Sequence, residues 1–286
     1  MRRILKSLYQ FCGEFSSTAI SLLSVVLFSS LKVLCFFKQE QRSRNRDDYC
    51  YIFGNGSSLK LFLQTNTHHL KDVMVVNFFG SSPQFRELKP NRYIVLDNIL
   101  IGRPVGDYPK NQVDKLYEDL EAVDWPMIFY YPSNGKMSRI KGLLNNQNIK
   151  VVIYNMTPVS GFKCISHWLF KMSLGMPRPQ NISNAAVFCA LNSGFKKIYL
   201  YGVEHSWMKS FTVDPSTHKI YLDDGHFYDK ENIECMKRGE YCNFLSYVHI
   251  ALKSHFELRE YADVIGAKII NKTPTSFIEA YEFEEY

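Results

Sequence analysis

The sequence YCYIFGNGSSL at residues 49–59 decides the fold, because a short apolar run ends there in a turn with two glycines. An apolar run that lacks alternation is typical of a β-strand that is buried on both faces. Glycine lets the backbone approach a phosphate or sugar closely, and the N–H groups at the start of a following helix favour an anion. We therefore predict a strand, a ligand-binding turn and a helix, with a tight turn that binds nothing as the alternative. The nucleotide-binding candidates in this turn are Gly54, Asn55, Gly56, Ser57 and Ser58.

Similar apolar runs recur along the chain and alternate with amphipathic stretches. This alternation predicts an α/β fold, with one doubly wound and mainly parallel sheet of the Rossmann-like type. The glycine spacing of the first turn is neither the dinucleotide motif G-x-G-x-x-G nor a P-loop, so NAD is disfavoured. The expected strands are 49–53, 73–77, 93–96, 127–131, 150–153, 197–201 and 268–270, and the expected helices are 111–123, 183–193 and 241–261. Residues 206–238 lack periodicity and are expected to form a long loop over the site.

Composition limits the kinds of partner. The chain has 286 residues, 46% of them hydrophobic, and a net charge of +6, which suits an anionic phospholipid, nucleotide or acidic glycan. No nucleic-acid motif or long basic run is present, so no nucleic-acid partner is expected. Seven cysteines without a C-x-x-C pair are typical of a reducing compartment.

The first 46 residues differ from the rest of the chain. Arg2, Arg3 and Lys6 precede an apolar stretch at 19–37, which contains Lys32 and several serines, and a basic segment at 38–46 follows. We predict a membrane-associating segment at 1–46 and one catalytic domain at 47–286. A shallow anchor is favoured, and a single spanning helix, a soluble helix, a disordered leader or a cleaved signal peptide are the alternatives. The expected location is the cytoplasmic face of a membrane, as a peripheral or single-pass protein.

Polar residues follow several of the other expected strands, where Rossmann-like folds bind nucleosides. Asn77 ends the second strand, and Asp97 and Asn98 end the third. Ser183 and Asn184 open a helix, for which Ser183 is the expected N-cap. Gly202 and Glu204 follow the strand at 197–201. Each could instead be an ordinary turn or cap residue without a ligand.

Two histidines are candidates for a catalytic base, because an imidazole beside a carboxylate accepts a proton near neutral pH. His226 follows Asp223, Asp224 and Gly225 in the long loop, and His205 follows the strand at 197–201. His226 is the expected base, and His205 is either a base or a phosphate contact. Tyr221 and Tyr228 could donate hydrogen bonds to a leaving phosphate. Asp223 and Asp224 are a weak metal candidate, and no metal site is expected.

The turn at 53–59 resembles the GNGPSL motif of bacterial family-42 sialyltransferases and of the MptE-like family. The sequence GFKKIYLYGVE at 194–204 resembles their G-Y-K-E-I-Y-L-x-G-I-D, and weaker similarities lie at Asn77, at 182–184 and at Thr273-Pro274-Thr275-Ser276. The similarity is patchy over residues 50–280. Ser57 replaces the proline of the motif, Asn184 replaces a glycine, and Glu204 replaces an aspartate.

The resemblance implies a glycosyltransferase with a nucleotide-sugar donor, possibly a CMP-linked sugar such as sialic acid, and a surface-glycan or lipid-linked acceptor. It also implies a loop histidine as base, and donor contacts at Pro274 and Ser276. No cofactor besides the nucleotide-sugar co-substrate is expected. Two alternatives are open. One is an MptE-like pyrophosphotransferase, which would need Mg²⁺. The other is a non-catalytic membrane-bound scaffold that binds a nucleotide.

Overall fold

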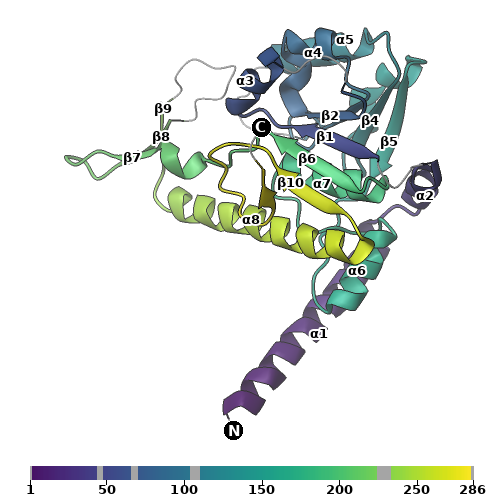
Figure 1. Ribbon diagram of the computed structural model, residues 1–286. Helices are drawn as coiled ribbons and strands as arrows, with labels where there is room; N and C mark the ends of the chain where they lie inside the picture. Colours follow the sequence, from purple (N-terminus) through teal and green to yellow (C-terminus); the bar gives the residue numbers. More distant parts are fainter. Residues whose placement is uncertain (1, 44–47, 66–69, 104–109, 224–232, 285–286) are drawn as a thin grey trace.

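The computed structural model describes residues 2–43, 48–65, 70–103, 110–223 and 233–284. Within these ranges, eight parallel strands form one sheet in the order β11-β10-β6-β1-β2-β3-β4-β5 (Figure 1). The predicted α/β class with a mainly parallel sheet is confirmed, and all seven expected strands are present. The strands are β1 (Tyr49–Phe53), β2 (Val73–Val76), β3 (Arg92–Ile94), β4 (Met127–Pro132), β5 (Ile149–Tyr154), β6 (Lys197–Tyr201), β10 (Lys268–Asn271) and the unexpected edge strand β11 (Glu282–Phe283).

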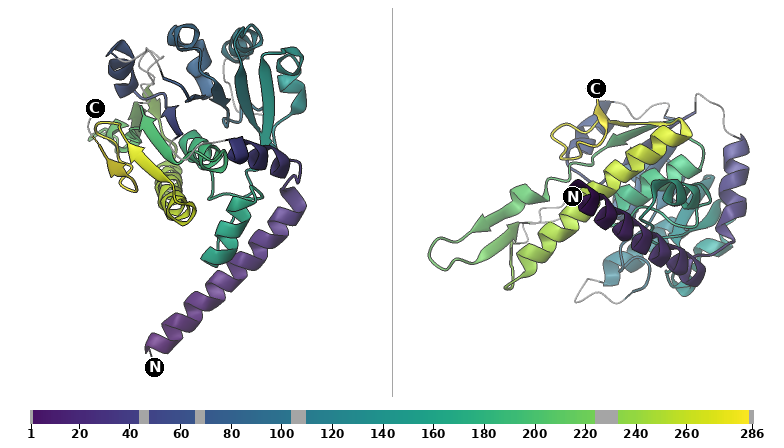
Figure 2. Two further views of the ribbon diagram at one scale, coloured as in Figure 1. Left: turned by 45° about the vertical axis from the view of Figure 1, so that its right-hand side comes forward. Right: turned by 90° about the horizontal axis from the view of Figure 1, so that it is seen from below.

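Helices cover both faces of the sheet, as expected for strands without alternation. In β1, Cys50 and Ile52 belong to one buried cluster, and Phe53 belongs to the other. The first cluster includes residues of α2 (Val33–Ser43), α6 (Lys163–Lys171), α7 (Ile182–Asn192) and α8 (Glu240–Ile265). The second includes residues of α3 (Ser58–Thr65), α4 (Gln84–Leu88) and α5 (Lys110–Glu121). The result is a three-layer sandwich (Figure 2).

The order of the strands reverses beside β1. The chain proceeds outward from β1 through β2, β3 and β4 to β5, and then returns through α7 to β6 on the other side of β1. In open α/β sheets, ligands bind in the crevice at such a switch point, outside the carboxyl ends of the strands. The carboxyl ends of β1 and β6 therefore mark the candidate site.

The expectation of a long loop at 206–238 was wrong for its described part. Three short antiparallel strands form a second sheet there: β7 (Phe211–Val213), β8 (Ile220–Asp223) and β9 (Ile233–Cys235). Phe211 packs against Tyr241 and Phe244 of α8, with ring centroids 5.0 and 4.8 Å apart. Strands of three or four residues are too short to show a periodicity of two in the sequence.

The second N-terminal helix packs with the folded domain. α1 (Arg2–Phe28) projects from the body of the molecule, whereas Val33 and Phe37 of α2 are core residues that are each 2% exposed. The buried guanidinium of Arg92 pairs with Glu40 of α2 and contacts the Tyr130 hydroxyl. α2 lies within the predicted membrane-associating segment at 1–46, and its apolar face packs against the sheet.

We predict that Phe37→Ala lowers the free energy of unfolding by about 3–5 kcal/mol, because it removes a large side chain from a packed core. Urea denaturation of the purified chain measures this loss. The matched control is Leu31→Ala, at a position that is 69% exposed, for which a change within about 0.5 kcal/mol is expected. Equal effects of the two substitutions would show that α2 is not part of the core.

Candidate functional site

The turns after β1 and β6 touch each other through their backbones. The N–H of Gly54 donates to the carbonyl of Tyr201 (2.8 Å), and that of Gly56 donates to the carbonyl of Gly202 (2.9 Å). A Cβ atom on Gly54 would lie 2.2 Å from the Gly202 oxygen, which no side chain could tolerate. Gly202 itself has a φ of +65°, in the left-handed region that favours glycine. The close approach that these glycines permit is therefore between the two turns.

A carboxylate of the protein occupies the start of α3. Glu204 Oε1 accepts a hydrogen bond from the N–H of Ser58 (2.8 Å), and a Cβ atom on Gly56 would lie 1.4 Å from Glu204 Oε2. Helix N-termini favour anions, and here the anion is Glu204. A phosphate at this position would have to displace or repel that carboxylate. Glu204 is better suited to accept hydrogen bonds from uncharged hydroxyls, such as those of a ribose.

The loop after β10 holds the β6 turn from the other side. The Ser276 hydroxyl donates to the carbonyl of Val203 (2.7 Å), and the N–H of Val203 donates to Thr273 Oγ1 (3.1 Å). The N–H of Phe277 donates to the carbonyl of Glu204 (2.7 Å). Pro274 lies within this loop, so the structure brings the predicted residues Pro274 and Ser276 next to Gly202 and Glu204.

Two histidines meet at the start of α7. His205 Nε2 lies 3.2 Å from His255 Nε2, and the Ser183 hydroxyl lies 3.3 Å from each of these atoms. His255 Nδ1 is 2.8 Å from the Tyr281 hydroxyl. His205 also stacks on Trp207, with ring centroids 4.4 Å apart, and its φ is +51°. His205 and His255 are both buried, and they come from segments fifty residues apart in the sequence.

The hydrogen bonds determine which nitrogen carries the proton. Asn181 Oδ1 accepts from the N–H of Asn184 (3.1 Å), so its Nδ2 is the atom that faces His205 Nε2 at 3.1 Å. An amide nitrogen can only donate, so His205 Nε2 accepts and its proton is on Nδ1. His255 then donates from Nε2 and accepts the Tyr281 hydroxyl proton at Nδ1. His205 Nε2 and both ring nitrogens of His255 then have hydrogen-bond partners while both rings are neutral.

Burial keeps both imidazoles neutral. It lowers the pKa of His205 to about 3, and it lowers the pKa of His255 well below its usual value, with a further decrease from the neighbouring His205. A group with so low a pKa is a weak base at neutral pH. The low pKa therefore disfavours His205 as the proton acceptor.

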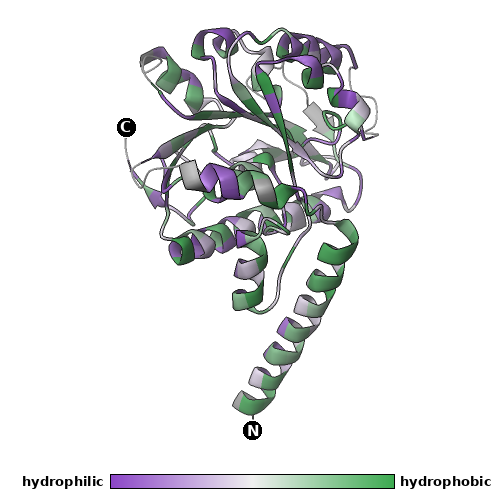
Figure 3. Cartoon of the chain, turned by 90° about the vertical axis from the view of Figure 1, so that its right-hand side faces the viewer, coloured by the Kyte–Doolittle hydropathy of each residue, from purple (hydrophilic) through white to green (hydrophobic). Residues whose placement is uncertain are grey.

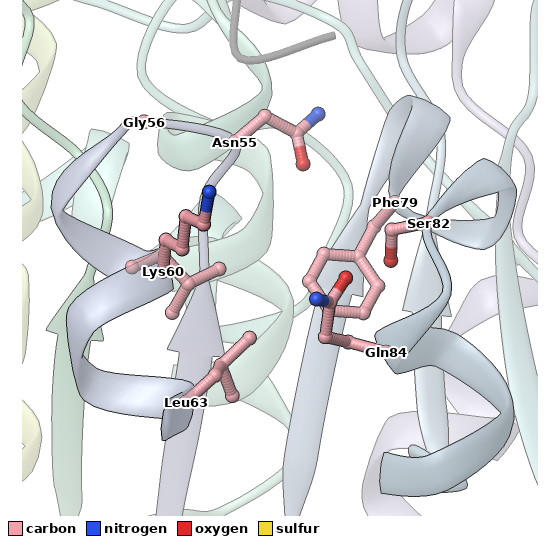
Figure 4. A pocket seen from close by; sticks show the side chains of 8 residues that line it. Asn55, Gly56, Lys60, Leu63, Phe79, Ser82 and Gln84 are labelled. Atoms are coloured by element: carbon pink, nitrogen blue, oxygen red, sulfur yellow. The ribbon is translucent and has the colours of Figure 1, made fainter. Parts of the chain in front are cut away.

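A shallow depression lies between the turn after β1 and the segment after β2 (Figure 4). Leu59 and Leu63 of α3 form part of its lining. The side chains of Asn55, Lys60 and Leu63 lie on one side of the depression, and those of Phe79, Ser82 and Gln84 lie on the other. Ser82 is 6% exposed, and no described residue offers its hydroxyl a hydrogen bond. The depression thus combines apolar side chains with amides, a hydroxyl and one cation, and the ring of Phe79 in its wall is only 2% exposed.

Other predicted site residues lie in different surroundings. The side chain of Asn77 is buried, and its Oδ1 accepts from the N–H of Leu96 (3.0 Å), linking the ends of β2 and β3. Asp97 and Asn98 are exposed in the turn after β3, two strands from β1. Tyr221 is in β8 of the small sheet. His226, Tyr228 and Asp224 lie outside the described residues.

One local detail differs from the prediction. The N-cap of α7 is Asn181, whose side chain accepts from Asn184, and not Ser183 as expected. The Ser183 hydroxyl instead donates to Asn181 Oδ1 (2.5 Å). Asn184 is fully buried, and its Nδ2 donates to the carbonyl of Ala251 (3.3 Å). Both predicted residues are thus engaged within the protein at the start of α7.

Sequence analysis missed five residues of this region: Lys60, Ser82, Gln84, His255 and Tyr281. Lys60 could have been noticed, because it lies in the first turn of the helix after the glycine turn. Nothing local marks His255, because its partner His205 is distant in sequence and only the packing of α8 brings them together.

Comparison with protein-family models found no match, and comparison with curated proteins found no relative. Over the described part of the chain, no group of three or more His, Cys, Asp or Glu side chains is placed to hold a metal ion. The arguments for function therefore rest on the geometry of the crevice and on the sequence resemblance.

We predict that the chain loses stability as the pH falls below about 6.5, the pKa of histidine in an unfolded chain. Because the folded-state pKa values of His205 and His255 are lowered, the unfolded state binds more protons below that pH, and acid favours unfolding. Each histidine should contribute a slope of about 1.4 kcal/mol per pH unit, down to about pH 3 for His205. Urea denaturation at a series of pH values measures the slope.

The variant His255→Gln should reduce the slope of stability against pH by the contribution of one histidine, about 1.4 kcal/mol per pH unit. This reduction is expected whatever the effect of the substitution on stability at neutral pH. The matched control is His249→Gln on the same helix, at an exposed position where water solvates the ring in both states. An unchanged slope in His255→Gln would mean that His255 is not held neutral in the fold.

Proposed function

We propose that this chain is a metal-independent glycosyltransferase that moves a sugar from a nucleotide donor to a surface-glycan or lipid-linked acceptor. The observation that carries the proposal is the depression beside the turn at Gly54–Gly56, which lies at the carboxyl end of β1 next to the switch point. Nucleotides bind at this position in open α/β sheets. The resemblance of residues 53–59 and 194–204 to sialyltransferase motifs supports the same assignment.

The charges at the crevice give the donor an orientation. Glu204 lies over Gly56, and Lys60 follows within the first turn of α3. A carboxylate accepts hydrogen bonds from ribose hydroxyls and repels phosphate, whereas an ammonium group attracts phosphate or carboxylate. We therefore place the nucleoside near Glu204 and the anionic end of the donor near Lys60.

The depression around Phe79 suits the sugar. The hydroxyls of a sugar need amide and hydroxyl partners like those of Asn55, Gln84 and Ser82. A ligand hydroxyl would give the buried Ser82 oxygen the partner that no described residue supplies. Lys60 at the rim favours a sugar that carries a carboxylate, in agreement with the CMP-linked acidic sugar implied by the resemblance.

In the proposed reaction, the acceptor hydroxyl attacks the anomeric carbon as the bond from that carbon to the phosphate oxygen breaks. His226 takes the acceptor proton, and the phosphate leaves with the electron pair of the broken bond. Lys60 and hydroxyl donors, with Tyr221 and Tyr228 as candidates, stabilise the charge that develops on the phosphate. His205 is proposed as a neutral donor beside the crevice, because its pKa of about 3 makes it a poor base.

The chain carries one N-terminal helix that is long and apolar enough to cross a membrane, Ile4–Phe28. We propose that it associates with the cytoplasmic face of a membrane, where nucleotide sugars and reduced thiols are both found. A membrane location suits a lipid-linked or surface-glycan acceptor.

We predict that CMP stabilises the purified chain against heat, and that EDTA leaves this effect unchanged. A ligand at 100 times its dissociation constant should add about 2.7 kcal/mol of stability. A panel of CMP, UDP, GDP and ADP, each with and without EDTA, measures the preference. If none of the four stabilises the chain, the crevice is not a nucleotide site; stabilisation that requires Mg²⁺ would favour a pyrophosphotransferase.

Two variants test the orientation of the donor. Lys60→Met should weaken CMP binding by about tenfold and leave cytidine binding unchanged, because cytidine lacks the phosphate. Glu204→Gln should weaken both ligands, since both contain the ribose. The control is Lys115→Met on α5, which removes an exposed lysine far along the sequence from the crevice. Equal affinities of the wild type and Lys60→Met for CMP would contradict the assignment of Lys60.

For the base, we predict that His226→Ala lowers kcat by about 10²–10⁴-fold and changes donor affinity little. His205→Gln should instead weaken donor binding while the enzyme retains measurable turnover. Both parameters are measured with the nucleotide sugar that the binding panel identifies. A fully active His226→Ala variant, together with an inactive His205→Gln variant that still binds donor, would reverse the two roles.

A further inference from the structure

The first helix presents its polar side to the protein and its apolar side outward. Thr18 and Ser21 are buried, whereas Leu8 and Phe15 are each 60% exposed and Val26 is 80% exposed. Helices on the surface of a soluble domain show the opposite arrangement. Figure 3 shows α1 extending from the body of the molecule, coloured hydrophobic along most of its length.

Hydrogen bonds hold α1 in this orientation. The N–H of Phe162 donates to the Thr18 hydroxyl (2.9 Å), and the N–H of Ser160 donates to the Ser21 hydroxyl (3.0 Å). Gly161 lies so close that a Cβ atom there would be 2.1 Å from Thr18 Oγ1. Further along, the hydroxyls of Ser29 and Thr157 are 2.7 Å apart. These contacts fix the rotation of α1 about its own axis relative to the folded domain.

The polar side continues beyond the docked part of the helix. Polar residues recur every three or four positions and so share one face: Arg3, Lys6, Gln10, Glu14, Ser17, Thr18, Ser21 and Ser24. The apolar residues on the opposite face are all exposed, among them Leu5, Leu8, Phe15, Leu22, Leu23 and Val26. This division into a charged face and a broad apolar face is typical of helices that lie in a membrane interface.

The docking contacts disfavour a spanning arrangement. The sixteen residues 2–17, at 1.5 Å per residue, reach only about 24 Å beyond the first docked residue, less than the roughly 30 Å of a bilayer core. A spanning helix would therefore pull the loop at 158–162, with its polar backbone groups, into the hydrocarbon and would also bury Glu14. An in-plane helix keeps Glu14 and the docking hydroxyls on the side away from the lipid.

We propose that α1 lies in the plane of one leaflet of an anionic bilayer, with its apolar face among the acyl chains. The cations Arg2, Arg3 and Lys6 near its end suit anionic headgroups. α6 lies beside α1 in both views (Figures 1 and 2), and the rings of Phe11 and Phe162 are 5.4 Å apart. Trp168 of α6 is 55% exposed, and tryptophan favours the headgroup level. This proposal is independent of the catalytic activity.

Vesicle flotation of the full chain tests the orientation with two charge-matched double variants. Leu8→Glu with Phe15→Glu places two carboxylates on the apolar face, and Gln10→Glu with Ser17→Glu places two on the polar face. On vesicles that contain phosphatidylglycerol, we expect the first pair to lower partitioning by more than about 100-fold and the second by less than about tenfold. All four positions are at least partly exposed, and unchanged thermal unfolding verifies that both variants fold.

The proposal has two clear ways to fail. Equal losses for the two pairs, with an N-terminal tag on the wild type protected from external protease, would show a spanning helix. A stable dimer of the wild type in vesicle-free buffer that does not float with lipid would show that a second copy covers the apolar face. An accessible tag together with selective loss in the Leu8→Glu, Phe15→Glu variant supports the in-plane helix.

Discussion

The backbone contact between the turns at Gly54 and Gly202 is the constraint on which the site depends. Neither turn has room for a side chain at the point of contact, since a Cβ atom on Gly54 would lie 2.2 Å from the Gly202 oxygen. This proximity continues the parallel pairing of β1 and β6 past the ends of the strands. It also brings the Glu204 carboxylate over Gly56. The negative charge at the start of α3 therefore depends on having no side chain at Gly54 and Gly56.

The sheet could be predicted from the sequence because its strands are buried on both faces and therefore contain continuous apolar runs. The same reasoning could not find β11, which has two residues, or β7, β8 and β9, which have three or four. The role of Ser21 and Ser29 could not be predicted either. In the sequence they only interrupt an apolar stretch, whereas in the structure they are among the groups that attach the N-terminal helix to the domain.

The site was predictable in position more than in detail. Strand ends in a parallel sheet share one edge, so Gly54, Asn77 and Gly202 could be placed together from their positions after strands. The hydrogen-bond partners of each side chain could not be predicted from the sequence. That Glu204 caps α3, that Asn181 caps α7, and that His255 faces His205 all depend on long-range packing that no local pattern encodes. Burial keeps the two imidazoles neutral, and Asn181 and Tyr281 supply hydrogen-bond partners for them.

If both proposals hold, the rigid attachment of α1 has a geometric consequence for catalysis at a membrane surface. A flexible tether would let the crevice sample many heights and tilts above a bilayer, whereas the contacts of Thr18, Ser21 and Ser29 allow only one. With α1 in the plane of a leaflet, the domain would hold the site at a fixed height above the bilayer. A lipid-linked acceptor could then react only when its terminal hydroxyl stands at the height of the crevice, so the length of the acceptor would be selected by the fold as well as by contacts within the site.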